Sequence, residues 1–573
     1  MSENFFTDNP DIQFRLAQID LREALELKEQ SYSQAGRFPG APRNYADAKD
    51  NYAIILGVMG EICGERVAPR AAEADEEGAH FEDGQVSYTA ATLDAIEAFR
   101  QAGLFGAMLP REYEGLNLPE SIYSMLVEIV ARAESGLMTV YGLQEIADMI
   151  EEYADDETKA RVLPRMARGE ASGAMVLTEA DAGSDLGAVA TRATLDEATG
   201  QWHLNGVKRF ITNGLADVSV VLARSEEGST DARGLSMFLV EKDATVKIRR
   251  IEHKMGIKSS PTCEIQYNNT PAVLIGKRRF GLMRYAMNLM NGARLAVAAQ
   301  ALGIAEAAYR EADRYSRERI QFGKPIRVLP AVGRLLLSMR VDLEATRALM
   351  AETSTWVDLW KAYERVVTAD GAEVSPETRA RHKQCVALAE TLTPMVKYCS
   401  TEMGNRVCYQ AMQVHGGVGY MKEFNIERLF RDVRITNIYE GTSQLQVVAA
   451  IGKVLNRSLD PLLNEWQAAE YSADMAPEKA TLIDLTATFQ KAVDALKAQD
   501  DRSKVDYYAC DLVDQAVWLV CSWLLLRDTN VLESKKSVAR TYIASIAPRL
   551  RAAAGVVTES NGAPLEAIGA LLA

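Results

Sequence analysis

The segment at residues 437–446, NIYEGTSQLQ, places a carboxylate beside a glycine just before a stretch with helical periodicity. Glu440 can act there as a general base, because a carboxylate removed from water has a raised pKa and accepts a proton more readily. The same spacing also fits a capping box, with Ser443 as the N-cap and Gln446 three residues on. In that interpretation Glu440 stabilises the positive end of the helix dipole. The two interpretations are compatible, and spacing alone favours capping, because S-x-x-Q is common at helix starts.

Two stretches earlier in the chain combine hydroxyl groups with turn residues. Residues 175–185 (MVLTEADAGSD) lead from a β-prone run into a turn rich in hydroxyls, and residues 208–214 (KRFITNG) join an aromatic ring, a hydroxyl and an Asn-Gly pair. The first can cradle a phosphate or the edge of a heterocycle, although Asp/Gly/Ser turns also occur without a ligand. The second, taken alone, predicts only a hairpin.

Two further motifs lie where helical patterns stop. Residues 317–326 (RERIQFGKPI) end a long helical pattern with two arginines, which also suit the negative end of a helix dipole. Residues 413–420 (QVHGGVGY) break another helical pattern with three glycines, which permit a turn or the close approach of a ligand or second subunit. Each motif alone is compatible with a purely structural role.

Hydrophobic periodicity divides the 573 residues into helical and β-prone regions. A polar extension at 1–49 precedes helical patterning at 50–171, short β-prone runs at 172–284, long Ala/Leu/Met stripes at 285–456 and amphipathic helices at 457–573. This order predicts an α+β protein with an N-terminal helical domain, a middle antiparallel β domain, a C-terminal four-helix bundle and an appended helical domain. It argues against a doubly wound sheet, and no G-x-G-x-x-G follows a predicted strand.

Composition excludes several classes of protein. The formal net charge of −15 repels phosphate backbones, so we expect no nucleic-acid partner. The five histidines are isolated and the seven cysteines include no C-x-x-C, which predicts no metal site, no disulfide framework and a reducing, cytoplasmic location. The N-terminal residues lack the basic and apolar regions of a secretory signal. The apolar stretch Ala516–Leu526 is about half the ~20 residues that span a bilayer, which predicts a buried helix and at most a peripheral membrane contact.

The five motifs, in the order in which they follow along the chain and inside an α–β–α layout, resemble the acyl-CoA dehydrogenase family of flavoproteins over roughly residues 50–455. A motif gains weight when the structural context predicted around it agrees, as it does here. The helical region at 457–573 is similar to the extension of longer members of the family. The resemblance implies the acyl-CoA dehydrogenase fold, FAD as the cofactor, and a role in fatty or carboxylic acid degradation through CoA thioesters.

The resemblance also implies which residues hold FAD, between the β domain and the bundle and with help from a second subunit. Thr178 and Ser184 would hydrogen-bond the flavin ring or the pyrophosphate, Phe210 would stack on the isoalloxazine, and Thr212 would face N5. Phe210 departs from the tryptophan of many members but keeps an aromatic platform. The other cofactor contacts would be Arg319, Gln321 and Phe322 from the adjacent subunit, Gln413 and Gly417 alongside them, and Thr442 and Gln444 closing the flavin site. We therefore expect a homodimer or homotetramer.

By the same resemblance, Glu440 is the catalytic base that removes the α-proton of an acyl thioester. Its own backbone N–H and a flavin ribityl hydroxyl would polarise the thioester carbonyl, as in an oxyanion hole. Some members place the base on the first bundle helix, just before a family-typical arginine. Here that position is Ala293, before Arg294, so Glu440 has no obvious rival and Arg294 would shape its surroundings.

The resemblance says less about the acyl group. Glutaryl-type members carry an arginine shortly after a Ser-Gly pair, whereas this chain has Met138 there, which disfavours a terminal carboxylate. Met138 and Gly142 suggest a roomy, apolar pocket for a longer, branched or alicyclic acyl group, although methionine is often core filler. Ser184, Tyr439 and Gly441 would also contact the substrate. The basic run at residues 277–279 can attract CoA phosphates or simply form a solvated turn.

Three functions remain open at this point. The favoured one is a dehydrogenase that yields 2,3-enoyl-CoA and is reoxidised by electron-transferring flavoprotein. An acyl-CoA oxidase that uses O₂ would need similar residues. A non-catalytic CoA-binding or scaffold protein is the third, because fold does not fix function.

Overall fold

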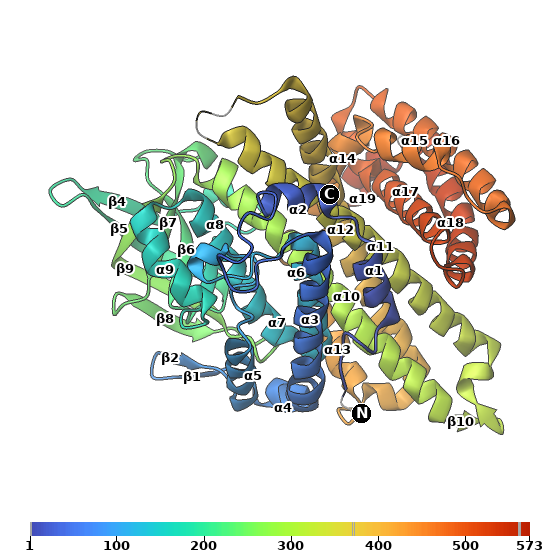
Figure 1. Ribbon diagram of the computed structural model, residues 1–573, viewed down its shortest axis with the longest axis horizontal. Coiled ribbons are helices and arrows are strands. Elements are labelled where there is room, and N and C mark those ends of the chain that lie inside the picture. Colours follow the sequence, from blue (N-terminus) through green and yellow to red (C-terminus); the bar gives the residue numbers. More distant parts are fainter. Residues whose placement is uncertain (1–2, 370, 372, 560–562, 573) are drawn as a thin grey trace. The chain divides into compact units, whose positions relative to one another are not determined.

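The computed structural model describes residues 3–369, 371, 373–559 and 563–572 (Figure 1). The chain forms two compact units. The first comprises Met1–Leu16, Glu29–Ala307 and Tyr420–Ile435, and the second comprises Ala17–Lys28, Ala308–Gly419 and Thr436–Ala573. The order of elements confirms the predicted α+β class, with N-terminal helices, a middle β-sheet, C-terminal helices and extra helices after them. The domain boundaries given above stay predictions.

Several helices of the first unit begin where the sequence supplies a capping side chain. Asn44, Thr89 and Asp155 each accept a hydrogen bond from the backbone N–H three residues on. These side chains satisfy N–H groups that have no partner within the helix. The helices are α1 (Pro10–Gln18), α3 (Tyr45–Ile62), α4 (Ala71–Glu77), α5 (Ala90–Gln101), α6 (Glu120–Ala133), α7 (Ser135–Gly142), α8 (Ile146–Tyr153), α9 (Asp156–Ala167), α13 (Asn425–Val433) and the first part of α10 (Met287–Glu318).

The N-terminal extension is packed more closely than its polar composition indicates. Phe5 and Phe6 are buried, and the N–H of Phe5 donates to the carbonyl oxygen of Gly60 in α3 at 3.0 Å. A Cβ on Gly64 would lie 2.1 Å from the backbone oxygen of Glu3. Glycine therefore lets the extension lie directly against the helix. The helix α1 and the small hairpin of β1 (His80–Glu82) and β2 (Gln85–Ser87) were not predicted from the sequence.

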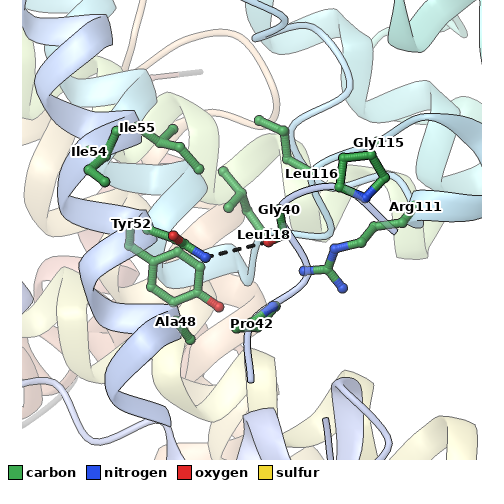
Figure 2. A pocket seen from close by; sticks show the side chains of 12 residues that line it. Gly40, Pro42, Ala48, Tyr52, Ile54, Ile55, Arg111, Gly115, Leu116 and Leu118 are labelled. Atoms are coloured by element: carbon green, nitrogen blue, oxygen red, sulfur yellow. Dashed lines mark hydrogen bonds between the residues drawn. The ribbon is translucent and has the colours of Figure 1, made fainter. Parts of the chain in front are cut away.

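A hollow of 230 Å³ lies between the extension and α3 (Figure 2). Figure 2 shows Tyr52 and Ile55 of α3 on one side of it and Arg111 on the other. The Arg111 guanidinium donates to the buried carboxylate of Glu29 at 2.7 and 3.1 Å. The positive charge at the rim of the hollow is therefore matched within the protein, and we assign no ligand to it.

A seven-stranded sheet forms the middle of the first unit, in the order β3-β6-β4-β5-β9-β7, with β8 beside β9. Its strands are β3 (Gly173–Val176), β4 (Arg192–Asp196), β5 (Gln201–Thr212), β6 (Val218–Arg224), β7 (Leu235–Glu241), β8 (Val246–Ile251) and β9 (Thr262–Ile275). Most pairs are antiparallel, β3 and β4 pair with β6 in parallel, and pairing of β6 with β7 closes the order into a ring. The hairpin prediction for residues 208–214 is wrong, because β5 pairs with β4 and β9 rather than with the strand that follows it.

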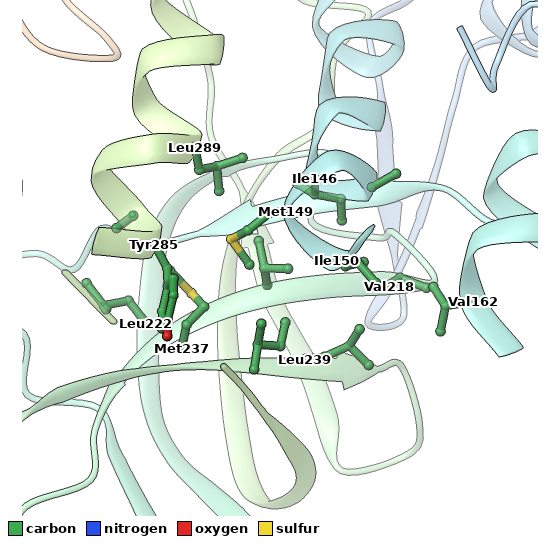
Figure 3. Packing of buried hydrophobic residues seen from close by; sticks show 14 of the residues in the cluster. Ile146, Met149, Ile150, Val162, Val218, Leu222, Met237, Leu239, Tyr285 and Leu289 are labelled. Atoms are coloured by element: carbon green, nitrogen blue, oxygen red, sulfur yellow. The ribbon is translucent and has the colours of Figure 1, made fainter. Parts of the chain in front are cut away.

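Both faces of the central strands are buried, which explains their nearly continuous apolar sequences. Val218 and Leu222 of β6 belong to one core with Ile146 and Ile150 of α8. Figure 3 shows this core, which also includes Tyr285, two residues before α10 begins. The intervening Val221 belongs to a second core on the other face. Alternate residues of one strand therefore supply two cores, as a period of two requires.

Helices of seven to forty residues make up most of the second unit. They are α2 (Arg22–Lys28), the end of α10, α11 (Pro330–Thr368), α12 (Pro376–His415), α14 (Ser443–Leu455), α15 (Asp460–Ala468), α16 (Ala476–Lys497), α17 (Arg502–Asp528), α18 (Lys535–Thr558) and α19 (Ala563–Leu571). The extra helices share a core with the bundle, because α17 packs against α11, α12 and α14 as well as against α16 and α18. The buried ion pair of Lys535 with Glu344, at 2.6 Å, joins α18 to α11.

Helix α17 contains the apolar stretch Ala516–Leu526. By length and composition the helix is apolar enough to cross a membrane, and 78% of its apolar window is buried inside the protein. Burial of this kind is that of a core helix, as the sequence predicted for this stretch.

Candidate functional site

The predicted base lies in a turn between α13 and α14, in the second unit. Glu440 is half-buried, and its φ of +54° is in the left-handed region, as is that of Gly441 at +89°. Left-handed backbone costs a non-glycine residue about 1–2 kcal/mol. Strain of this size persists only where surrounding contacts hold it, and such positions cluster at functional sites.

The predicted capping box is not formed. Helix α14 begins at Ser443 with Thr442 as its N-cap, and the Thr442 hydroxyl accepts from the N–H of Leu445 at 3.4 Å. Ser443 instead donates its hydroxyl to the carboxylate of Glu402, which also accepts from the Asn437 side chain at 3.0 Å. The prediction was displaced by one residue, because Thr442 and Ser443 are both good caps and sequence alone does not choose between them.

Two buried side chains hold the carbonyl groups of the strained turn. The amide of Gln446 donates to the carbonyl oxygens of Glu440 at 3.0 Å and Gly441 at 3.1 Å. The ammonium of Lys397 on α12 donates to the carbonyl oxygen of Gly441 at 2.6 Å. Both Lys397 and Gln446 are 0% exposed. The backbone of the turn is thus fixed from two helices.

The proposed flavin residues Thr178, Phe210 and Thr212 lie on neighbouring segments of the first unit. The N–H of Arg209 donates to the carbonyl oxygen of Thr178 at 3.0 Å, which joins the loop after β3 to strand β5. Phe210 has a φ of +60° and is 51% exposed. The Arg209 guanidinium lies 4.6 Å from the centroid of this ring, and the exposed part of the ring can stack on a ligand.

A buried ion pair between Lys208 and Glu179 connects strand β5 to the loop after β3. Lys208 is 0% exposed, and its ammonium donates to the carbonyl oxygen of Leu177 at 2.7 Å and lies 2.9 Å from the Glu179 carboxylate. Burial lowers the pKa of Lys208 to about 8, although Glu179 opposes the shift. Burial alone would raise the pKa of Glu179, but the Lys208 charge and hydrogen bonds from Thr191 and Ala190 outweigh it and lower that pKa.

The loop that carries Ser184 is pinned by an arginine. The guanidinium of Arg224 donates to the carbonyl oxygens of Gly187 at 2.7 Å and Val189 at 2.9 Å. Ser184 itself is exposed at the start of this loop. The loop is thus held in shape while its hydroxyl remains accessible.

The proposed flavin residues fit a bound heterocycle. Across the described parts of the chain, no group hydrogen-bonds the hydroxyls of Thr178, Ser184 and Thr212. Hydroxyl groups and an aromatic ring are the kinds of group that hydrogen-bond the edge and stack on the face of an isoalloxazine. The donor set is therefore consistent with FAD.

The proposed ADP-binding residues lie in the second unit. A hairpin of β10 (Ile320–Gln321) and β11 (Lys324–Pro325) follows α10, with Arg319 and Gln321 exposed and Phe322 88% exposed at a φ of +51°. Gln413 and Gly417, at the end of α12, are also exposed.

A ring stack links the two helix ends that carry these residues. Tyr315 near the end of α10 stacks on His415 of α12, with ring centroids 4.6 Å apart. Burial lowers the pKa of His415. The stack brings both proposed ADP-binding motifs to one end of the bundle.

Met138 and Gly142 lie on α7 in the first unit. The nearest heavy atom to a Cβ built on Gly142 is the Cε of Met138, at 3.1 Å. Arg294 lies on α10 of the same unit, half-buried, and donates to the Asn291 side chain at 2.9 Å. Tyr439, Thr442 and Gln444 flank Glu440 in the second unit. The residues predicted to form the site are therefore divided between the two units, and the geometry of each group is described within its own unit.

The sequence did not predict several of these supporting residues. They are Lys208, Glu179, Arg224, Lys397 and the buried carboxylate Glu145, whose Oε2 lies 3.3 Å from a Cβ built on Gly292 beside Arg294. A lysine or glutamate inside a polar motif has no pattern that marks it as buried. In the basic triplet, Arg278 donates to Glu226 at 2.6 Å and to the Ser225 carbonyl oxygen at 2.9 Å, which ties it to the fold.

A metal-binding cluster of three or more His, Cys, Asp or Glu residues is absent from the described residues.

Four family profiles match consecutive parts of the chain. The profile described as "Acyl-CoA dehydrogenase, N-terminal domain" matches residues 53–170, "middle domain" matches 174–270 and "C-terminal domain" matches 283–455. A fourth, "Acyl-CoA dehydrogenase C terminal", matches 458–558. The matches therefore extend over the helices after the bundle.

Relatives agree with these profiles. The 3-methylmercaptopropionyl-CoA dehydrogenase of Ruegeria pomeroyi is 35% identical over 435 residues, which cover 71% of this chain and 71% of the relative. The structure of butyryl-CoA dehydrogenase from Megasphaera elsdenii is 28% identical, with a TM-score of 0.61, over 70% of this chain and 98% of that chain. An acyl-CoA dehydrogenase from Bacillus anthracis, complexed with FAD, is similar in fold over 91% of this chain and 90% of its own, with a TM-score of 0.75 and 23% identity.

Proposed function

Because this chain belongs to the acyl-CoA dehydrogenase family of FAD-dependent oxidoreductases, we propose that it converts an acyl-CoA thioester into the 2,3-enoyl-CoA. Glu440 removes the α-proton, and the β-hydrogen leaves as hydride. Electrons then pass to electron-transferring flavoprotein. The observation that carries this proposal is the held, strained turn that presents Glu440.

FAD, when bound by these residues, would supply the two-electron acceptor for the hydride. Thr178, Ser184 and Thr212 would hydrogen-bond it and Phe210 would stack on its ring, consistent with the open hydroxyls and the exposed aromatic face. On the protein side, Glu440 takes the proton onto its carboxylate, while its backbone N–H polarises the thioester carbonyl. In this proposal Arg294 would help to shape the surroundings of the base.

A second subunit completes the cofactor site in this proposal. Arg319, Gln321 and Phe322 lie on a hairpin whose apolar tip is exposed, a feature that suits contact with another copy of the chain. Gln413 and Gly417 would meet the same ADP half, and Gln444 would close the flavin side. The protein is then at least a homodimer.

The acyl group is proposed to lack a negative charge at its far end. Met138 stands where an arginine would bind a distal carboxylate. Met138, Gly142, Ser184, Tyr439 and Gly441 are the proposed substrate contacts. The name of the Ruegeria relative adds a short acyl chain with a thioether to the candidates.

An anaerobic visible spectrum of the FAD-loaded protein tests the proposal. Butyryl-CoA, octanoyl-CoA, 3-methylmercaptopropionyl-CoA and an alicyclic acyl-CoA are added in turn to the wild type and to Glu440→Gln. We expect one class to bleach the flavin band of the wild type but not of Glu440→Gln. Glu423→Gln, a change at an exposed carboxylate, is the matched control and should bleach normally.

Two results would contradict the proposal. A protein that cannot be loaded with FAD would instead be a CoA-binding or scaffold protein on this fold. Equal bleaching by Glu440→Gln would remove Glu440 from the role of base.

A further inference from the structure

We propose that Lys397 and Gln446 are positioning residues that set the reactivity of Glu440 by holding the carbonyl groups of its turn. The inference rests on the proposed function, because it concerns the same base. Both side chains act on the main chain of the turn, because they donate hydrogen bonds to its carbonyl oxygens.

Burial of the Lys397 ammonium costs free energy, because the charged group loses its contact with water. Its ammonium is 0% exposed and donates to the carbonyl oxygen of Gly441 at 2.6 Å. A buried ammonium needs hydrogen-bond acceptors to replace water. A neutral residue of similar length would fill the space, so the charge points to a task beyond packing.

Gln446 holds the other side of the turn. Its amide donates to the carbonyl oxygens of both Glu440 and Gly441, at 3.0 and 3.1 Å. It lies in the first turn of α14, which begins immediately after the loop. The bulk of Gln446 also explains Gly441, because a Cβ there would lie 2.6 Å from its Nε2 atom.

The contacts from Lys397 and Gln446 hold Glu440 in a backbone conformation that is unfavourable for glutamate. Positive φ is unfavourable for glutamate, so a released turn would relax and move its side chain. Displacement of a reacting group by about 1 Å costs about 10²-fold in rate. The proton-transfer step is therefore the step that depends on Lys397 and Gln446.

The ends of the loop are held separately. The N–H of Ser443 donates to the carbonyl oxygen of Asn437 at 3.1 Å, and Glu402 accepts from the side chains of both residues. Loss of Lys397 or Gln446 would thus loosen the centre of the loop while its ends stay closed. This arrangement predicts an effect on rate without loss of the fold.

The test uses FAD-loaded Lys397→Met and Gln446→Met. The control is Lys453→Met, which makes the same change at a half-exposed lysine on α14 whose partner is the surface carboxylate Glu390. Proton removal is measured alone, as uptake of solvent deuterium at the α-carbon of 3-thiabutanoyl-CoA and 3-thiaoctanoyl-CoA by mass spectrometry. These probes have sulfur in place of the β-carbon and therefore no β-hydride to transfer.

We expect each test variant to bind FAD and probe as the wild type does, and to exchange deuterium about 10²-fold more slowly. The combined variant should lose less than the product of the two single losses, because both residues hold one turn. Lys453→Met should exchange at the wild-type rate. Wild-type exchange in Lys397→Met and Gln446→Met, or a loss explained by weaker FAD binding or a lower melting temperature, would overturn the proposal.

Gln446→Glu supplies a signature that a packing role would not give. The introduced carboxyl donates a hydrogen bond only when protonated, and it repels the two carbonyl oxygens when ionised. Its exchange rate, divided by that of the wild type at the same pH, should therefore rise as pH falls, while the ratio for Gln446→Met stays flat. Parallel ratios for the two variants would contradict the assignment.

Failure of this inference is distinct from failure of the proposed function. If the wild type neither exchanges deuterium nor bleaches with any acyl-CoA, the function itself is wrong. If the wild type does both and the variants match it, only the positioning role is wrong.

Discussion

Two fully buried lysines support the two halves of the proposed site in different ways. Lys208 in the sheet of the first unit is paired with Glu179, which also accepts from the N–H groups of Ala190 and Thr191 at 2.8 and 2.9 Å. Lys397 in the second unit works beside the neutral Gln446, and both donate to a turn of two residues. The first arrangement joins three chain segments, whereas the second fixes one bend.

The difference indicates how each region should respond to change. An ion pair that joins segments far apart in the sequence contributes to the stability of the domain. A clamp on one turn contributes mainly to the geometry of the residue it carries. Substitutions in the two regions should therefore differ in how much they change stability and how much they change the rate of proton removal.

The largest effect is expected from breaking the Lys208–Glu179 pair. Removal of one member of a buried pair leaves an unmatched charge and costs about 3–5 kcal/mol. Glu179→Gln should therefore lower the free energy of unfolding in urea by that amount and weaken FAD binding, because the Thr178 loop is released. Lys397→Met in the same experiment should change stability far less. Similar losses of stability in both variants would remove the distinction.

The pH dependence of stability gives the next largest effect. The pKa of Lys208 is lowered to about 8 in the folded protein, so between pH 8 and the ordinary lysine value near 10.4 the unfolded chain binds more protons. Stability of the wild type relative to Lys208→Met should therefore rise with pH across that window, by up to about 3 kcal/mol. Urea titrations at intervals of pH measure it. A relative stability that falls across the window would show that the pKa is raised instead.

Gly441→Ala tests the bend in the second unit. The φ of +89° and the close Nε2 of Gln446 both oppose a Cβ, so we expect a loss of about 1–2 kcal/mol and a slower α-proton exchange. Gly452→Ala, at a position on α14 where a Cβ would meet nothing within 4 Å, is the control. Normal exchange in Gly441→Ala would mean that the bend does not control the base.

Phe210→Leu should give the smallest effect. Loss of the aromatic face removes about 0.5–1.5 kcal/mol of stacking, so the dissociation constant of FAD should rise by roughly threefold to tenfold. Phe210→Trp should retain the affinity. Fluorescence titration of the FAD-free protein measures both, and an unchanged affinity of Phe210→Leu would place the flavin elsewhere.

The sequence predicted those elements that depend on local patterns. The apolar runs of β6, β7 and β9 and the helix around Ala516–Leu526 follow from periodicity and from the residues that bound them. The hairpin at residues 208–214 and the cap at Ser443 were wrong for a related reason. An Asn-Gly pair or a Thr-Ser pair is compatible with more than one local structure, and tertiary contacts decide among them.

The candidate site was predicted only as far as its motifs. Glu440, Phe210 and the hydroxyl residues are marked by unusual neighbours, whereas Lys208 and Lys397 stand in ordinary polar or helical sequence. Their importance comes from burial against carbonyl groups of distant segments, which no single stretch of sequence encodes. The contacts that hold the turn of Glu440 therefore became visible only in the structure.

The most direct test of the central claim is α-deuterium exchange by the FAD-loaded wild type and Glu440→Gln, with 3-thiaoctanoyl-CoA in D₂O. Glu440 as the base predicts exchange by the wild type and a loss of about 10²–10⁴-fold in Glu440→Gln, while binding of the probe is retained. Undiminished exchange in Glu440→Gln would contradict the assignment of Glu440 and require another residue to remove the proton.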